Sequence, residues 1–369
     1  MKRLVLVGGG HAHVEVLRTF AQAPAPAEVT LVTRAPWLVY SGMVPGVIAG
    51  HYELDDCSID LARLATRAGV RTVFSEAVRV DDAARVVVCA NGNAISYDLL
   101  SLDVGSVSPM ERVRGAREHA VPMRPLDGVV KRFVALLDAA RAGRVRAVTL
   151  VGGGAAGVEL AFAMAHRLRA ELGAPPHVRV ITDTPAIVPE FPAMARARLK
   201  RELGRRGIGV HPASPVTEIS ASAVTTAHGH TFASEAVFWA AGAAAQPWIA
   251  AAGFATDKRG FLLVDATLRS TSHPHVFGAG DCVTRADAEL PKAGVFAVRA
   301  APVLARNLRA ALEAAPLEGH RTDRRFLALV STGSRHALAA WNGFSWYGAW
   351  LWRVKDRIDR AFVSRYNAG

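Results

Sequence analysis

The sequence AVTLVGGGAAGVELA, residues 147–161, decides the fold. A short apolar run leads into Gly152, Gly154 and Gly157, spaced as G-x-G-x-x-G, and apolar residues then recur at helical spacing. The glycines permit a tight turn and a close approach of backbone to a pyrophosphate, and the helix N-terminus offers free N–H groups to the anion. This stretch therefore predicts a Rossmann-type unit.

A weaker copy of this pattern opens the chain. Residues 3–17, RLVLVGGGHAHVEVL, repeat the strand, turn and helix, with Gly8 and Gly10 in the first two glycine positions and His13 in the third. His11 and His13 lie in the first helical turn, where they could contact a pyrophosphate, pack within the fold or face solvent. Two copies predict two dinucleotide sites, and hence electron transfer between two nucleotides.

An acid at the end of the strand that follows a fingerprint binds the ribose of a dinucleotide. The first unit has Thr33-Arg34 there, whereas the second has Asp183, one position later than the ideal. Asp183 favours NADH. His177 and Arg179 flank the same strand and could bind a 2′-phosphate, so NADPH stays open.

Residues 271–282, TSHPHVFGAGDC, form a short apolar run and a turn of small residues that holds Asp281. A carboxylate there would accept hydrogen bonds from the hydroxyls of a ribityl chain, and Gly278 and Gly280 would let the backbone lie against that chain. The alternative is that Asp281 caps the next helix.

With these motifs the chain resembles the two-dinucleotide-binding-domain flavoproteins, the pyridine nucleotide-disulfide oxidoreductase superfamily. The A-T-G-type strand of that family is present at residues 237–242 and, in degenerate form, at 97–106. In the family the first fingerprint binds FAD and the second binds NAD(P)H. The resemblance covers nearly the whole chain and implies an α/β fold: two Rossmann-like three-layer domains, the second inserted in the first, plus a short C-terminal segment.

The order of the motifs divides the chain into domains. We expect a discontinuous FAD-binding domain at 1–118 and 244–318, an NAD(P)H-binding domain at 119–243, and a C-terminal segment at 319–369.

Residues 40–46, YSGMVPG, lie where disulfide reductases of the superfamily carry their redox cysteines, and this run has none. The acceptor is therefore expected not to be a dithiol. The remaining pattern resembles the type II NADH dehydrogenases and the FAD-dependent oxidoreductases found fused to selenide, water dikinase. The segments that carry this closer resemblance are 8–18, 40–52, 97–106, 291–299 and 353–360.

The resemblance implies two sets of nucleotide-binding positions. For FAD they are Gly8, Gly10, His11, Ala12, Thr33, Pro45, Val78, Gly280, Asp281, Gly294 and Val295. For NAD(P)H they are Gly152, Gly154, Gly157, Asp183 and Gly242.

Hydride transfer from nicotinamide to flavin requires neither a nucleophile nor a general base, so positioning and charge stabilisation remain for the protein. Lys292 is the candidate cation for the negative charge of the reduced flavin, the alternative being a solvated surface lysine. Glu159 would, by resemblance, stand between nicotinamide and flavin. The alternative is that Glu159 is an acid in the first turn of the helix, where its negative charge interacts favourably with the helix dipole.

The formal net charge is +12, but most of the basic residues are arginines in a chain rich in alanine throughout. We read this charge as a compositional bias and expect no nucleic-acid partner. Cys57, Cys89 and Cys282 lie far apart without metal-ligand spacing, so we expect neither a metal site nor disulfides, which fits a reducing cytoplasm. The apolar run starts at Leu4, which leaves no room for a secretory signal.

Aromatic and basic residues gather at 341–365. Trp346, Trp350, Val354, Ile358 and Phe362 are each four residues apart and predict an apolar stripe on one helix. A basic, Trp-rich amphipathic helix can lie in a membrane interface, here at the inner face of the cell membrane. The alternative is a helix that packs on the FAD domain or on a second subunit of a homodimer.

The sequence thus predicts an FAD-dependent NAD(P)H dehydrogenase that passes electrons to a quinone or a similar small acceptor. A sulfide:quinone oxidoreductase-like enzyme is an alternative, and it would require Cys57, Cys89 and Cys282 to converge near the flavin. A further alternative is a nucleotide-binding redox partner or sensor in selenium metabolism.

Overall fold

Two parallel sheets carry the fold of the computed structural model, which describes residues 1–124 and 126–368. The strands of the first sheet are, in spatial order, β19 (Val276–Gly278), β9 (Leu99–Leu102), β1 (Arg3–Val7), β2 (Glu28–Thr33) and β5 (Arg71–Phe74). Those of the second are β10 (Ala120–Pro122), β17 (Ala236–Trp239), β11 (Ala147–Val151), β12 (His177–Ile181) and β13 (Gly209–His211). Every strand of the second sheet lies in sequence between β9 and β19, so the second unit is inserted in the first.

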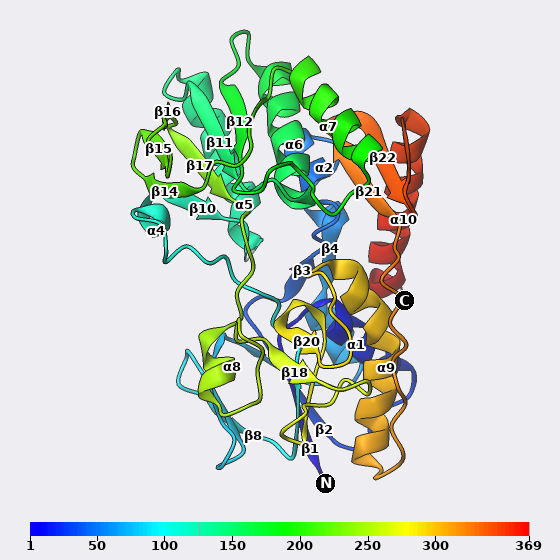
Figure 1. Cartoon of the computed structure of the whole chain (residues 1–369). Helices are drawn as coiled ribbons and strands as arrows, with labels where there is room; N and C mark the ends of the chain where they lie inside the picture. Colours follow the sequence, from blue (N-terminus) through cyan, green and yellow to red (C-terminus); the bar gives the residue numbers. More distant parts are fainter. Residues whose placement is uncertain (125, 369) are drawn as a thin grey trace.

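Helices cover these sheets and complete the Rossmann-like α/β architecture that the sequence predicts. In the first unit α1 (His11–Gln22) packs against α9 (Gly294–Leu312) and α3 (Leu61–Arg67). The second unit contains α5 (Asp127–Arg141), α6 (Ala155–Glu171) and α7 (Ala193–Arg205). The two units form the lower and upper lobes of Figure 1. They meet where α2 (Val44–Ala49) packs against α6.

Smaller elements connect the sheets. Antiparallel sheets are formed by β6 (Ala77–Asp81), β7 (Val86–Cys89) and β8 (Ala94–Ser96), by β14 (Val216–Ile219), β15 (Ala223–Thr226) and β16 (Thr231–Ala233), and by β3 (Trp37–Val39) with β4 (Ser58–Asp60). The strands β18 (Leu262–Val264) and β20 (Val283–Arg285) pair in parallel. Short helices are α4 (Ala116–His119) and α8 (Pro247–Ala251), and the 3₁₀ turns are η1 (Asp55–Cys57) and η2 (Gly280–Cys282).

The C-terminal segment lies against both units. Its three strands, β21 (Ala328–Thr332), β22 (Ser334–Trp341) and β23 (Phe344–Gly348), pack against α6 and α7. The helix α10 (Ala349–Asn367) then runs down beside α1, β4 and η1 of the first unit (Figure 1). The expectation that Trp346 belongs to the helix is wrong: it lies on β23, because the pairing with β22 continues to Gly348.

The two faces of α10 have different surroundings. Trp350 and Ile358 are 57% and 48% exposed, so most of the expected stripe faces outward. Phe362 is the exception, since its ring stacks on Tyr40 at 4.6 Å between centroids. The opposite face of the helix is buried, with Leu351, Lys355, Asp359, Val363 and Tyr366. Within the described residues, no helix combines the length and apolarity needed to cross a membrane.

Candidate cofactor sites and active site

The turn of the first fingerprint is shaped by Gly8. Its φ is +97°, and a Cβ there would collide with the carbonyl of Asp103 at the end of β9. The turn therefore requires glycine both for its dihedral angle and for the close approach of the neighbouring strand. Gly10 then becomes the N-cap of α1, as the strand–turn–helix prediction requires.

A buried carboxylate lies at the N-terminus of α1. Asp103 is 3% exposed, and its Oδ2 accepts hydrogen bonds from the backbone N–H groups of Ala12 at 2.7 Å and His13 at 3.0 Å. Burial raises the pKa of Asp103 to about 7, and the nearby charge of Asp281 acts in the same direction. Sequence reasoning did not single out Asp103, although an acid in the degenerate A-T-G-type strand was a visible signal.

The two histidines of α1 are packed inside the protein. His13 is fully buried: its Nδ1 donates to the carbonyl of Gly8 at 2.6 Å, and its Nε2 lies 2.8 Å from the Ser101 hydroxyl. It thus joins α1 to the sheet at the third glycine position. The ring of His11 packs against Tyr40 and Phe362, and its buried Nε2 has no hydrogen-bond partner in the described part of the chain. Burial lowers the pKa of both rings to about 4, so both are neutral near pH 7.

The second fingerprint repeats this geometry on α6. Gly152 has φ +122°, and a Cβ there would lie 2.6 Å from the carbonyl carbon of Ala240. A Cβ on Gly157 would collide with the carbonyl of Gly152. Among the described residues no atom lies within 4 Å of a Cβ built on Gly154, so the N-terminus of α6 is open. Asp183 is exposed just beyond the carboxyl end of β12, where a ligand of a parallel sheet binds.

The loop at η2 brings Asp281 beside the first fingerprint. Gly280 has φ +76°, and a Cβ there would lie 2.5 Å from Oδ1 of Asp103. Arg124 lies 3.6 Å from the Asp281 carboxylate and donates at 3.1 Å to the carbonyl of Gly242. Arg124 therefore links the two places where the chain passes between the units. Nothing in its sequence context pointed to this role.

Lys292 is turned into the protein rather than solvated. Its ammonium donates to the carbonyl of Val283 and, at 3.1 Å, to the hydroxyl of Thr284, and it lies 3.8 Å from the centroid of the Phe261 ring. Burial lowers its pKa to about 8. Gly294 and Val295 follow at the start of α9, and a Cβ on Gly294 would lie 4.0 Å from the Ser41 hydroxyl. The start of α9 thus faces residues 40–46.

Glu159 lies under the C-terminal segment. Its carboxylate accepts a 2.7 Å hydrogen bond from the N–H of Ser331 on β21. Burial raises its pKa to about 7, against the opposing charge of Lys355 on α10. Lys355 in turn donates to Asp359 at 2.6 Å and to the carbonyl of Gly42 at 2.7 Å. The sequence signalled Glu159 through its motif, but gave no sign that α10 would bring a lysine to it.

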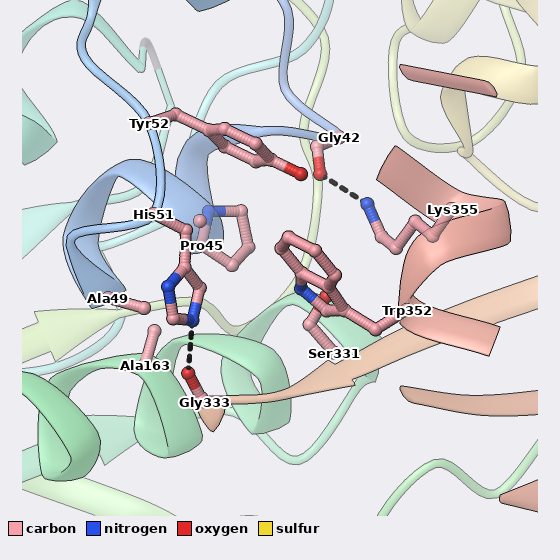
Figure 2. Close-up of a pocket in the computed structure, with 11 residues that line it drawn as sticks. Gly42, Pro45, Ala49, His51, Tyr52, Ala163, Ser331, Gly333, Trp352 and Lys355 are labelled. Atoms are coloured by element: carbon pink, nitrogen blue, oxygen red, sulfur yellow. Dashed lines mark hydrogen bonds between the residues drawn. The ribbon is translucent and has the colours of Figure 1, made fainter. Parts of the chain in front are cut away.

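A small cavity lies beside this cluster, between α2, α6, β21 and α10 (Figure 2). Its volume is about 10 Å³, close to the room that one water molecule needs. Pro45, Tyr52, Trp352 and Lys355 line it, and His51 lies 2.8 Å from the carbonyl of Gly333 across one end. Pro45 is thus brought to the interface of the units.

The remaining FAD positions, Thr33 and Val78, lie on two different sheets. Thr33 is buried at the end of β2, where its hydroxyl donates to the carbonyl of Ala35 at 3.4 Å. Val78 lies on β6, outside the parallel sheet, with its side chain 46% exposed. The Thr33 hydroxyl borders the first fingerprint, since it would lie 2.9 Å from a Cβ built on Gly9.

Cysteines and metal ligands do not form a site in the described part of the chain. Cys57, Cys89 and Cys282 are buried free thiols, and burial raises the pKa values of Cys57 and Cys282 to about 12. Residues 1–124 and 126–368 contain no group of three His, Cys, Asp or Glu side chains that could hold a metal ion.

These features fit dinucleotides. Each fingerprint has a backbone cradle that a Cβ would fill at Gly8 or Gly152, placed before the N-terminus of a helix. Asp281, the acid predicted to accept hydrogen bonds from ribityl hydroxyls, lies beside the first cradle. Two such cradles in one chain define a protein that binds two dinucleotides.

Comparison with known proteins gives the family. The model of the pyridine nucleotide-disulphide oxidoreductases matches residues 2–302, and the chain belongs to this family. It is an NAD(P)H-dependent oxidoreductase with FAD as its cofactor.

Individual relatives share the fold over most of their length. An NADH dehydrogenase-like protein of Mycobacterium tuberculosis is 28% identical over 76% of this chain and 72% of its own. A demethylphylloquinone reductase of Synechocystis is 23% identical, covering 85% and 81%. Among solved structures, a sulfide:quinone oxidoreductase of Aquifex aeolicus (TM-score 0.83, 16% identity, 99% and 91% covered) and NDH2 of Plasmodium falciparum (0.79, 14%, 100% and 99%) have similar folds.

Proposed function

We propose that this protein is an NAD(P)H dehydrogenase that passes electrons from its FAD to a quinone or a similar small acceptor. One observation carries the proposal: α10 presents an apolar, basic face outward, while its inner face supplies Lys355, whose charge acts on Glu159. A helix of this kind joins a lipid-facing surface to the active site. The names of relatives, a demethylphylloquinone reductase and an NADH dehydrogenase-like protein, support the same class of acceptor.

When bound, FAD would supply the hydride-accepting group. The residues of the chain bind both nucleotides, orient them and compensate their negative charge. In this proposal the cofactor occupies the domain at 1–118 and 244–318, held by Gly8, Gly280 and Asp281. The nicotinamide nucleotide occupies 119–243, held at Gly152 and Gly157. The proposal includes the other predicted FAD and NAD(P)H positions, and it places Lys292 as a cation near the FAD.

We assign Glu159 the role of holding a proton beside the small cavity. Reduction of a quinone to a quinol consumes two protons, so a group that exchanges protons near neutral pH is useful at its site. A buried carboxyl whose pKa is raised to about 7 meets this need. Lys355 stabilises the ionised form of Glu159 and so keeps the pKa from rising further.

The outward face of α10 supports attachment to the inner surface of the cell membrane, with the rest of the protein in the cytoplasm. Trp341 and Phe344 at the β22–β23 turn are exposed along with Trp350 and Ile358, and Arg353 and Arg357 extend beside them. Exposed apolar surface with basic flanks favours an anionic membrane interface. A second copy of the chain is the alternative occupant.

The nucleotide site favours NADH. Asp183 is exposed beyond the carboxyl end of β12, the edge at which a ribose would lie. Arg179 lies inside the strand, where its guanidinium donates to the carbonyl of Ala233 at 2.7 Å, and His177 is at the opposite end. Neither is placed at the edge where a 2′-phosphate would bind.

The cysteines favour a dehydrogenase over a sulfide:quinone oxidoreductase-like enzyme. The latter requires paired, reactive thiols near the flavin. Cys57 is packed in the core around α1, whereas Cys89 and Cys282 are packed in the core on the other face of the first sheet. Burial keeps the thiols of Cys57 and Cys282 protonated, because it raises their pKa values far above neutral.

Anaerobic mixing of the purified yellow protein with NADH or NADPH tests the proposal. We expect NADH to bleach the flavin faster than NADPH, and a short-chain quinone then to restore the flavin absorbance. Bleaching by sulfide but by neither nicotinamide would contradict the dehydrogenase assignment. Bleaching by NADH followed by reoxidation with other electron carriers, and none with quinones, would contradict the quinone acceptor alone.

A further inference from the structure

The two fingerprints allow an internal comparison of two cofactor sites in one chain. At the first, Gly8 packs against the backbone of Asp103, and at the second Gly152 packs in the same way against the backbone of Ala240. Asp103 and Ala240 are also at the same place in their strands, directly after the residue that pairs with the last residue of β1 and of β11. The first site therefore has a carboxylate where the second has a methyl group.

This difference changes the N-termini of the two helices. At α6 no described atom would lie within 4 Å of a Cβ on Gly154, so the free N–H groups are open to a ligand. At α1 the carboxylate of Asp103 occupies the space in front of Gly10 and accepts the N–H groups of Ala12 and His13. These N–H groups are the donors that a helix offers to a pyrophosphate.

We propose that FAD binding is coupled to protonation of Asp103: the neutral carboxylic acid shares the N-terminus of α1 with the FAD pyrophosphate, and the carboxylate competes with it. Two anions at the same buried donors repel each other strongly in a medium of low dielectric constant. A neutral carboxyl can instead donate its O–H to a phosphate oxygen. Above neutral pH the Asp103 carboxylate takes one proton from solution for each FAD bound, and apart from this O–H bond no covalent bond forms or breaks.

The groups around Asp103 leave it as the one that changes charge near neutral pH. Its pKa is about 7, raised by burial and by Asp281 on η2, while the N–H groups of α1 act in the opposite direction. His13 on α1 stays neutral because its pKa is about 4. Cys282 on η2 stays protonated, with a pKa of about 12. Arg124 lies against Asp281 and not against Asp103.

The sign of the pH dependence follows from this coupling. Below pH 7 Asp103 is already neutral in the free protein, so the affinity for FAD is insensitive to pH. Above pH 7 the free protein must gain a proton to bind, and the affinity falls by up to about tenfold for each pH unit. At the second site, where Ala240 replaces the acid, this proton uptake has no counterpart.

Dilution of the full-length holoprotein between pH 6 and 9, with free FAD followed by its fluorescence, tests the coupling. The wild-type dissociation constant should rise above pH 7, whereas Asp103→Asn should bind with little pH dependence and more tightly than wild type at pH 9. Asp103→Ala, which recreates the arrangement at Ala240, should behave in the same way. Asp281→Asn should weaken FAD binding overall and retain the fall in affinity with pH, which should begin at a lower pH because the Asp281 charge raises the pKa of Asp103.

A measurement on the unaltered protein gives a second readout. When FAD is released at pH 8 in weak buffer with an indicator dye, about one proton should be released per FAD, and none at pH 6. A wild-type slope retained in both Asp103 variants, or release of FAD at pH 8 without a proton, would overturn the proposal. It depends on FAD binding and not on the quinone acceptor, so either can fail alone.

Discussion

The ammonium of Lys355 lies 2.6 Å from the carboxylate of Asp359, one turn further along α10, and both side chains are buried. This ion pair lies on the buried face of α10, among Leu351, Val363 and Tyr366, while Trp350 and Ile358 are exposed on the opposite face. Lys355 also donates to the carbonyl of Gly42, so the pair connects the C-terminal segment to the first unit. The pair is thus part of both the packing and the electrostatics of the Glu159 site.

Lys355→Met should lower the free energy of unfolding by about 3–5 kcal/mol, because it leaves the Asp359 carboxylate buried without its partner. Lys355→Met combined with Asp359→Leu should recover much of this loss. Arg360→Met on the same helix is the matched control, since its pair with Asp356 is exposed and contributes about 0–1 kcal/mol. Chemical denaturation of the FAD-loaded protein measures all three, and equal losses for Lys355→Met and Arg360→Met would contradict the burial argument.

Glu159→Gln should change how stability depends on pH. The folded pKa of about 7 lies above the ordinary value of 4.5, so the folded state binds more protons than the unfolded state between these values. Stability of the wild type therefore falls as pH rises from 4.5 to 7, by roughly 3 kcal/mol for this one group. The glutamine variant lacks this loss and should gain on the wild type over that range.

Thermal unfolding at pH 5 and pH 8 tests this prediction, with Glu190→Gln as a control at an exposed glutamate of the same unit. Glu190→Gln should follow the wild-type curve. Quinone reduction by Glu159→Gln should in addition lose a pH step near 7. If the difference between Glu159→Gln and wild type is the same at both pH values, the carboxylate is ionised throughout.

A substitution at Gly157 tests the second nucleotide site separately from the first. A Cβ there would collide with the carbonyl of Gly152, so Gly157→Ala should distort the second cradle and slow flavin reduction by NADH at least about tenfold, with FAD content unchanged. Gly204→Ala on α7 is the control, since no described atom lies within 4 Å of its Cβ. Stopped-flow bleaching and the ratio of flavin to protein absorbance measure both effects. Loss of FAD from Gly157→Ala, with NADH binding retained, would mean that the two sites are reversed.

The fold and the glycine cradles were predictable because they depend on local patterns. A strand, a glycine turn and a helix are continuous in sequence, and Gly8 and Gly152 occupy fixed positions in them. The role of Asp103 was not predictable, and for His13 the sequence left pyrophosphate contact, packing and solvent exposure open. Where their side chains point depends on how β9, some 90 residues later, packs against α1.

The C-terminal helix shows a second limit of sequence reasoning. The spacing of Trp350, Val354 and Ile358 predicts one face, but the face at Leu351, Lys355 and Asp359 has the same spacing. Which face is buried depends on partners in the first unit, such as Glu15, which accepts hydrogen bonds from Tyr366 and Arg365. Those contacts join residues some 350 positions apart, and no local pattern encodes them.

The exposed face of α10 gives the last prediction. Trp350→Ser with Ile358→Ser should abolish binding to anionic vesicles and reduction of a long-chain quinone in them, because each inserted apolar side chain contributes transfer free energy. Reduction of a soluble dye by NADH and the melting temperature should stay near wild type, since both residues are on the surface.

Arg353→Gln with Arg357→Gln should weaken vesicle binding by about 1 kcal/mol per charge and reduce its salt dependence. Leu351→Ser, on the buried face, is the contrasting control and should lower stability instead. For the same reason, deletion of the whole segment would not separate membrane binding from packing. If the stripe instead binds a second copy, sedimentation will show a dimer that the serine variant dissociates, and the wild type will not bind vesicles.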